Sequence, residues 1–231
     1  MQEESINLKN SENLILPSSP PKAPIFIPHY MRYPTFILFL LLNLQSGLSL
    51  SAFTPLNLTL SRFYNLKTST IVLSSTFFLI GNAISVFVVY PLNKNLGITN
   101  CVRIGLIFNF LGCGLRVLIN HSFYWVLLGQ FLMGFASCCV YNNQMEFNFN
   151  WFPMKSRAIF NSILTLSVYI GGGLGNSIPL FLINESQITT HFQAENEIYY
   201  YSLNMFIFVG ILSLFNLIFF RGTPPTGYGY F

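Results

Sequence analysis

The residues of this chain that could do chemistry are a few amides and two charged groups within or beside long apolar segments. These residues are Gln45, Asn82, Asn109, Gln130, Gln144, Glu146 and Arg116. Polar groups are costly inside a bilayer, so each one is a candidate functional residue. An amide can equally hold two helices together through a hydrogen bond, and this alternative applies to every amide in the set. We expect Arg116 to extend to the membrane surface and Glu146 to face water.

Residues that could build a catalytic or metal site do not come together in the sequence. All seven acidic residues are Glu, the three His are isolated, and the four Cys lack a CxxC spacing. The sequence contains no set of nucleophile, base and orienting acid, and no phosphate-binding loop. We therefore expect no enzyme activity, no metal and no cofactor. The basic residues are spread over loops, which argues against a nucleic-acid partner.

The elements that carry these residues are predicted to be membrane-spanning helices. Hydrophobic residues make up 52% of the chain and charged residues 8%, whereas soluble domains have about 25% charged residues. A helix that spans a bilayer needs about 20 mostly apolar residues. Six segments meet this requirement, at residues 33–53, 70–90, 102–119, 123–141, 158–183 and 201–220. The sequence therefore predicts an all-α membrane protein with six transmembrane helices, the second of which ends at Pro91.

The predicted organisation is a polar arm over residues 1–32, a helix bundle over 33–221 and a short tail over 222–231. The arm has neither the pattern of a cleavable signal nor that of a transit peptide. Its prolines suit an extended strip in a partner's groove, with a flexible linker as the alternative. The tail carries aromatic residues among glycines. We expect both ends to contact other membrane-protein subunits.

Basic residues near the predicted helix ends indicate that both termini lie on the positive, cytoplasm-like or matrix-like side of the membrane. Glycosylation sequons at Asn57, Asn120 and Asn184 fall on the opposite side, although composition alone predicts about as many by chance. The segment 142–157 mixes Asn with aromatic residues, as an interfacial connector does. We expect Trp151 and Phe152 at the depth of the lipid headgroups, and Arg157 in water.

Three runs of the chain resemble the amino-terminal half of the feline leukaemia virus subgroup C receptor-related family of major facilitators. They cover residues 111–130, 150–158 and 161–179, and the most specific positions are Trp151, Phe152, Arg157, Ala158, Ser162, Ile163, Gly171, Gly175 and Pro179. The resemblance implies half of a major-facilitator fold. Such carriers move small organic solutes, with choline-like amines and haem among them, through a site between two six-helix halves. The spacing of Gly171 and Gly175 also lets a neighbouring helix approach closely.

Several positions depart from the pattern of that family. The loop 91–100 has no acidic residue to brace the gate, and the first helix has no Trp to hold an amine by cation–π attraction. On the fifth helix, Val168 and Tyr169 stand where the family has an Asn-Gln pair that faces the cargo. The sequence also ends soon after the sixth predicted helix, so we expect a half rather than a whole carrier.

These departures favour a degenerate half-transporter that serves as a non-catalytic accessory subunit of a larger membrane complex. The predicted location is a respiratory-chain or ATP-synthase complex of the mitochondrial inner membrane, with the secretory pathway or plasma membrane as the alternative. The competing hypothesis is a half-transporter that homodimerises to carry a small organic solute. The residues predicted to face a solute or to pack helices are Gln45, Asn82, Gln130, Tyr169, Gly171 and Gly175.

Overall fold

The computed structural model describes residues 26–27, 29–183, 188, 190–225 and 229–230, so most of the predicted arm and the sequon at residue 184 lie outside it. The described chain is almost entirely helical. Its elements are β1 (Phe26–Ile27), α2 (Arg32–Ser51), the 3-10 turn η1 (Thr54–Leu56), α3 (Asn57–Phe63), α4 (Thr68–Arg116), the 3-10 turn η2 (Val117–Asn120), α5 (Phe123–Tyr141), α6 (Gln144–Trp151), α7 (Arg157–Leu182), α8 (His191–Phe219) and β2 (Gly229–Tyr230).

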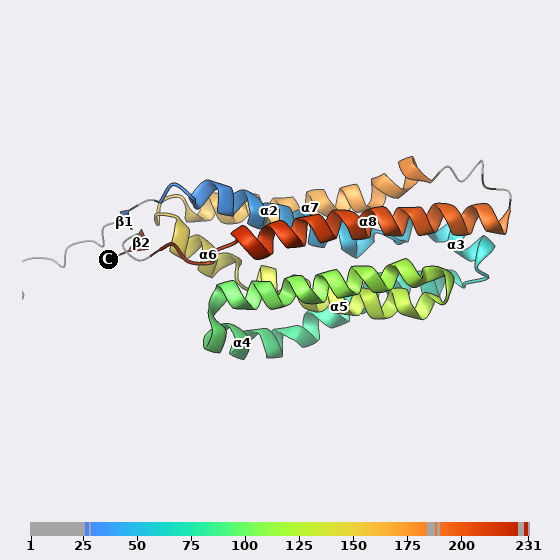
Figure 1. The fold of residues 1–231 in the computed structure, drawn as a ribbon, viewed down its shortest axis with the longest axis horizontal. Coiled ribbons are helices and arrows are strands. Elements are labelled where there is room, and N and C mark those ends of the chain that lie inside the picture. The colour runs from blue at the N-terminus through green and yellow to red at the C-terminus, as the bar shows by residue number, and fades with distance from the viewer. Residues whose placement is uncertain (1–25, 28, 184–187, 189, 226–228, 231) are drawn as a thin grey trace, which may run out of the picture.

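Five helical segments of the described chain are long and apolar enough to cross a membrane. The longest, α4, has 49 residues and would be about 74 Å long if it were straight, more than twice the roughly 30 Å of hydrocarbon. It is not straight, because its backbone leaves the helical conformation at Gly97 and the chain folds back into two antiparallel arms (Figure 1). The predicted bundle of six membrane crossings is therefore confirmed, with two crossings supplied by α4.

The turn within α4 differs from the prediction that Pro91 ends the second helix. Pro91 lies inside α4, and the chain reverses at Gly97, where φ is 74° and ψ is 164°. This conformation is open almost only to glycine, since a Cβ would strain the backbone there. The side chain of Pro91 is exposed, and the first arm continues past it to the turn.

The last helix begins ten residues earlier than predicted. The prediction followed hydropathy, which starts at Tyr201, but α8 starts at His191. Thr190 accepts a hydrogen bond from the backbone N–H of Gln193, whose side chain in turn accepts from the backbone N–H of Thr190. This reciprocal capping box satisfies two N–H groups that a helix start would leave unpaired.

Replacing Thr190 with alanine should fray the first turn of α8. Loss of a capping side chain costs about 1 kcal/mol, which lowers the midpoint of thermal unfolding by about 2–4 °C in a protein of this size. Hydrogen–deuterium exchange should accelerate in residues 192–195 and stay unchanged in the apolar part of α8. The control is Thr190→Ser, which keeps the hydroxyl. Equal exchange in the alanine and serine variants would contradict the role of the cap.

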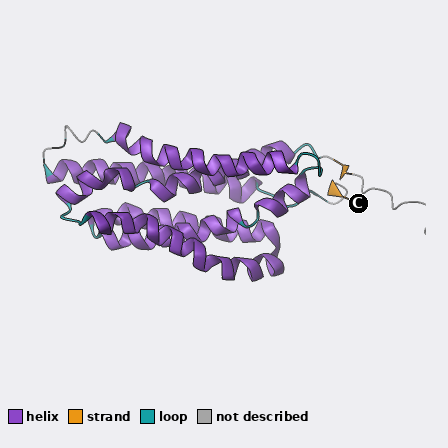
Figure 2. Cartoon of the chain, turned by 180° about the vertical axis from the view of Figure 1, so that it is seen from behind, coloured by secondary structure: helices purple, strands orange, loops and turns teal. Residues whose placement is uncertain are grey.

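The helices run along one common axis and form two groups, with α2, α7 and α8 on one side and both arms of α4 with α5 on the other (Figures 1 and 2). Within the groups α2 packs against α7, and α5 packs against α4. Helix α8 joins the groups, because it contacts both α4 and α2. One end of the bundle holds α6, the Gly97 turn, β1 and β2 and is called the α6 end; the opposite end, with α3 and η2, is called the α3 end.

Two large hydrophobic clusters occupy the two ends of the bundle, and a smaller third one, around Cys101 and Cys139, joins α4 to α5. The cluster at the α3 end is built around Phe53 and Tyr201, whose rings pack edge to face at 6.4 Å. The cluster at the α6 end contains Phe39, which stacks on Phe147 at 4.7 Å and on Phe220 at 5.4 Å. Aromatic pairs at these distances add about 0.5–1.5 kcal/mol each beyond burial. The clusters fix the two ends of the bundle.

The described parts of the N-terminal arm (residues 1–32) and of the C-terminal tail (residues 222–231) pair with each other. Phe26 lies opposite Tyr230 and Ile27 opposite Gly229 in an antiparallel ladder between β1 and β2. Both segments lie at the α6 end, as an even number of membrane crossings requires (Figure 1). The predicted contact of these segments with other subunits stays a prediction.

Candidate functional site

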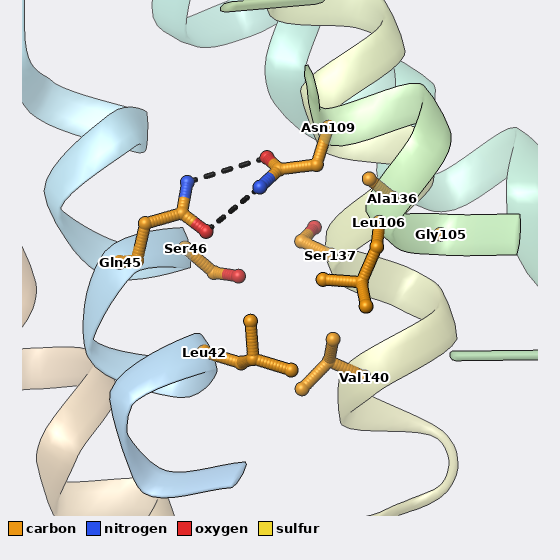
Figure 3. Close-up of a pocket in the computed structure, with 9 residues that line it drawn as sticks. All are labelled: Leu42, Gln45, Ser46, Gly105, Leu106, Asn109, Ala136, Ser137 and Val140. Carbon is orange, nitrogen blue, oxygen red and sulfur yellow. Dashed lines mark hydrogen bonds between the residues drawn. The ribbon is translucent and has the colours of Figure 1, made fainter. Parts of the chain in front are cut away.

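The middle of the bundle holds a reciprocal pair of amides. Gln45 on α2 donates from Nε2 to Asn109 Oδ1 at 3.2 Å, and Asn109 on the second arm of α4 donates from Nδ2 to Gln45 Oε1 at 2.9 Å (Figure 3). Gln45 Nε2 also donates to the hydroxyl of Ser49 at 3.0 Å. Both amides are buried. Each amide satisfies the other, so the pair joins α2 to α4.

A small cavity lies beside this amide pair, between α2, α4 and α5. It is lined by Gln45, Asn109, Leu42, Ser46, Gly105, Leu106, Ala136, Ser137 and Val140 (Figure 3). Its volume is about 10 Å³, which is about the least space that one water molecule needs. The interior beside the amide pair is therefore packed, and the cavity is too small for an organic solute.

Two further amides from the predicted set also bridge helices. Asn82 on the first arm of α4 donates to Ser137 Oγ at 2.9 Å and to the carbonyl oxygen of Gly134 at 3.4 Å, both on α5. Gln130 on α5 donates to the carbonyl oxygen of Ser49 on α2 at 3.2 Å. Of the two possible roles of these amides, the structure shows them in helix packing.

Gly171 and Gly175 lie where α7 meets α2. A Cβ on Gly171 would come closer than 3.0 Å to the backbone carbonyl of Leu44, and Gly175 faces the next turn of α2 in the same way. Across the same contact Ser51 Oγ donates to the carbonyl oxygen of Gly172 at 2.9 Å. The two helices touch through their backbones, so both glycines pack helices.

Tyr169 is the predicted residue that the bundle leaves open, with 73% of its surface exposed. It lies on the side of α7 that faces away from α2, because it is two residues and about 200° from Gly171. This uncovered side also carries Ser162, Thr165 and Asn176. The adjacent sector of α7 is apolar and contains Ile163, Ile170, Leu174 and Phe181. Helix α7 therefore presents one polar and one apolar side outside the bundle.

Trp151 and Phe152 do not face the lipid headgroups as anchors would, since both rings are about 1% exposed and lie in the cluster at the α6 end. Their depth in the membrane stays a prediction. Trp151 Nε1 donates to the carbonyl oxygen of Arg221 at 3.1 Å. Arg157 is partly buried and donates to the carbonyl oxygens of Phe152 and Phe149, with its guanidinium 4.1 Å from the Phe149 ring. Helix α6 thus turns its aromatic side inward and closes the bundle.

The expectation for Arg116 is wrong. Its side chain is 2% exposed and lies inside the bundle at the α3 end. The guanidinium carbon is 4.6 Å from the centre of the Phe53 ring, and Nη1 donates to Met133 Sδ at 3.4 Å. The side chain extends inward from the end of α4, so it does not reach the membrane surface.

Comparison with known proteins identifies the family of this chain. The family model described as Major Facilitator Superfamily matches residues 39–229. The chain belongs to the major facilitator superfamily. A solved structure of the fucose:proton symporter of Escherichia coli has the same fold, with a TM-score of 0.59 and 15% sequence identity. The match covers 80% of this chain and 48% of the symporter, so the chain spans about half the length of that carrier. No curated protein matches the chain.

The reversal between the second and third crossings of this facilitator contains an acidic contact that the sequence did not reveal. The family pattern has an acidic residue in the segment 91–100, and this chain has none there. Asn93 lies in that segment, and its Nδ2 donates a hydrogen bond to Glu146 Oε2 at 2.6 Å. Glu146 belongs to α6. The carboxylate at this turn is therefore supplied by the connector after the fourth crossing and not by the loop itself.

A group of amides between α6 and α7 of the facilitator bundle was only partly anticipated. Gln144 Nε2 donates to the carbonyl oxygen of Asn161 at 2.9 Å, to Asn161 Oδ1 at 3.1 Å and to Thr165 Oγ1 at 3.0 Å. Asn148 donates to Asn161 Oδ1 at 3.3 Å. The Asn-rich composition of 142–150 was the available signal. It could not show that these side chains fix α6 onto α7.

Proposed function

We propose that this facilitator bundle is a non-transporting accessory subunit of a larger membrane complex. The observation that supports the proposal best is the use of its amides: Gln45, Asn82 and Gln130 all bond to neighbouring helices of the same bundle. In a carrier of this family the solute site lies between two six-helix halves, so amides that bind a solute would face out of the bundle and would not bond to helices within it. The fold and family make the chain a transporter-type membrane protein, and the accessory role is the step that we add.

The exposed surface of the bundle supports the proposal that a partner protein lies beside it. The first arm of α4 buries one stripe of residues against α5 and leaves large apolar side chains uncovered, with Phe87 and Tyr90 the most exposed. Lipid can cover this arm. On the polar side of α7, Thr165 and Asn176 bond to carbonyl oxygens of α7 itself. The exposed phenol of Tyr169 is less suited to lipid, because its hydroxyl has no hydrogen-bond partner among acyl chains. A protein surface with a complementary polar group would satisfy it.

The same polar side favours a second candidate function. If a second six-helix bundle faced α7 across a water-filled cavity, then Ser162, Thr165, Tyr169 and Asn176 would line the solute path. The chain would then be one half of a carrier for a small organic solute, formed with a second copy. The resemblance to the feline leukaemia virus subgroup C receptor-related carriers belongs to this reading. In both readings α7 is covered by protein, and the identity of that protein separates them.

Site-specific photocross-linking tests the cover on α7. A photoreactive phenylalanine analogue at position 169 should cross-link to one protein of defined mass in native membranes. The matched control is the same analogue at position 170, where Ile170 lies on the apolar sector and is also exposed. That position should give lipid adducts and little protein cross-linking. We expect a several-fold excess of protein adduct at position 169.

The mass of the adduct distinguishes the outcomes of this experiment. A partner with a sequence other than that of this chain supports the accessory subunit. An adduct of two copies of the chain supports the half-carrier and contradicts the accessory role. Equal and diffuse labelling at positions 169 and 170 would show that lipid covers α7, against both readings.

The location and remaining partners belong to the same proposal. We place the subunit in the mitochondrial inner membrane, with the secretory pathway or plasma membrane as the alternative, and both ends on the positive side. Basic residues gathered at the α6 end support that orientation, and they are Arg32, Lys94, Arg103, Lys155, Arg157 and Arg221. The antiparallel pairing of β1 with β2 places arm and tail together at this end, where one partner could contact both.

A further inference from the structure

Arg116 is the single charged residue among the buried side chains of the described chain. No ion pair involves it there, since the one described salt bridge joins His191 to Glu195. Glu195 and Glu197 lie in the first turns of α8, and Glu146 lies on α6 at the opposite end of the bundle. A buried cation without a counter-charge is strongly unfavourable, and in a membrane protein it marks a functional site by default.

The surroundings of Arg116 provide weak substitutes for a counter-ion. Nη1 donates to the thioether of Met133 at 3.4 Å, and a thioether is among the poorest acceptors available in proteins. The guanidinium lies over the Phe53 ring at 4.6 Å, so a cation–π contact replaces part of its lost hydration. Nη2 has no hydrogen-bond partner in the described part of the protein. Of the two terminal nitrogens of the guanidinium, one therefore has a weak acceptor and the other has none among the described residues.

A second unpaired group lies on the same stretch of the bundle. Gln130 Oε1 is buried without a hydrogen-bond partner among the described residues. Gln130 bonds to Ser49 near the end of α2, and Phe53, which covers Arg116, lies just beyond that helix end. Its neighbour Gly129 packs against the Arg116 side chain. Unpaired buried polar atoms are rare in native proteins and call for water, an ion or a ligand.

We propose that Arg116 anchors an internal site for a small monovalent anion, either a halide or a carboxylate group. The anion accepts hydrogen bonds from the guanidinium in place of the Met133 thioether. Met133 is unbranched and flexible, so rotation of its side chain opens space next to Nη1. A water or hydroxyl group that accompanies the anion donates to Gln130 Oε1. The site lies inside the half-bundle and is independent of the accessory role.

Thermal unfolding of the full chain in mild detergent tests this proposal. The four cysteines are free and buried, so a thiol-reactive fluorophore reports unfolding. The protein is heated in sodium chloride, in sodium formate and in sodium gluconate of the same ionic strength, because gluconate is too large for the site. We expect the midpoint to be roughly 5–10 °C higher in the small anion at 100 times its Kd. The chloride and formate arms show which anion is preferred.

Three variants make the result specific. Arg116→Met should abolish the anion-dependent rise and should unfold at a higher temperature than the wild type in gluconate, since it removes the unpaired charge. Arg103→Met is the matched control on the same arm of α4 and should keep the full rise. Met133→Leu removes the competing acceptor. It should lower, several-fold, the anion concentration at which the midpoint of thermal unfolding has risen by half of its full increase.

The outcomes decide the proposal in each case. A rise that is present in the wild type and Arg103→Met but absent in Arg116→Met supports it. A wild-type midpoint that is equal in all three salts overturns it, and so does an equal rise in Arg116→Met. If Arg116→Met does not fold, the decision rests on Met133→Leu. An unchanged anion dependence in that variant then counts against the site.

Discussion

Replacing Gly171 with leucine should separate α7 from α2 and destabilise the bundle more than any other single change considered for this chain. The new side chain would collide with the backbone carbonyl of Leu44, which cannot move without shifting the whole of α2. Overpacking of this kind costs about 3 kcal/mol or more. The midpoint of thermal unfolding should therefore fall by roughly 6–12 °C. Size-exclusion chromatography in detergent should show loss of the monodisperse peak.

Gly173 provides a matched control within the same run of glycines. A Cβ at Gly173 would meet no atom within 4 Å, because this residue lies on the uncovered side of α7. Gly173→Leu should leave the midpoint unchanged or raise it slightly, since glycine is about 1 kcal/mol worse than alanine inside a helix. If Gly171→Leu were as stable as Gly173→Leu, the close contact of α2 with α7 would be refuted.

Separate replacement of Gln45 and Asn109 by leucine should destabilise the bundle, and the double replacement should cost less than the sum. Each single change leaves the other amide buried without its partner, at about 1–3 kcal/mol. The two amides donate to each other at 3.2 and 2.9 Å, so the coupling should be about 0.6–2 kcal/mol. Thermal midpoints of the four proteins in the cycle measure this coupling.

The same cycle separates a packing role from a solute-binding role for the pair. Amides that contact a solute and not each other would give additive losses in the absence of solute. Additivity within about 0.3 kcal/mol would therefore contradict the amide pairing shown in Figure 3. A suitable pair for comparison is Asn82 with Gln130, which bond to separate partners and should be additive.

The helix content of the fold could be predicted well from the sequence, because apolar length is a strong and local signal. The crossing predicted at 123–141 coincides with α5, whose start is capped by Ser122. The start of α8 was missed because its first turns are polar and lie outside the hydropathy signal. The turn in α4 was placed at Pro91 because proline is the stronger sequence signal. The structure places it at Gly97, where the backbone needs a positive φ.

The candidate site could be predicted only as a set of residues, not as a set of contacts. The sequence identified Gln45 and Asn109 as polar groups in apolar helices, but their pairing depends on the relative register of α2 and α4. Trp151 and Arg116 were expected at the surface because composition shows only that a segment contains both polar and apolar residues. Which side of the segment is covered depends on its neighbours in the bundle. Both residues are covered by the bundle itself.

Native mass spectrometry of the protein released from its own membrane in mild detergent shows which molecules accompany it. We infer that this facilitator bundle, whose amides bond between its own helices, works beside other proteins and carries no solute itself. We predict a particle of fixed stoichiometry in which this chain is accompanied by different membrane subunits and no small organic molecule. A stable dimer of the chain that retains such a molecule between its two copies would instead show that the chain is half of a carrier.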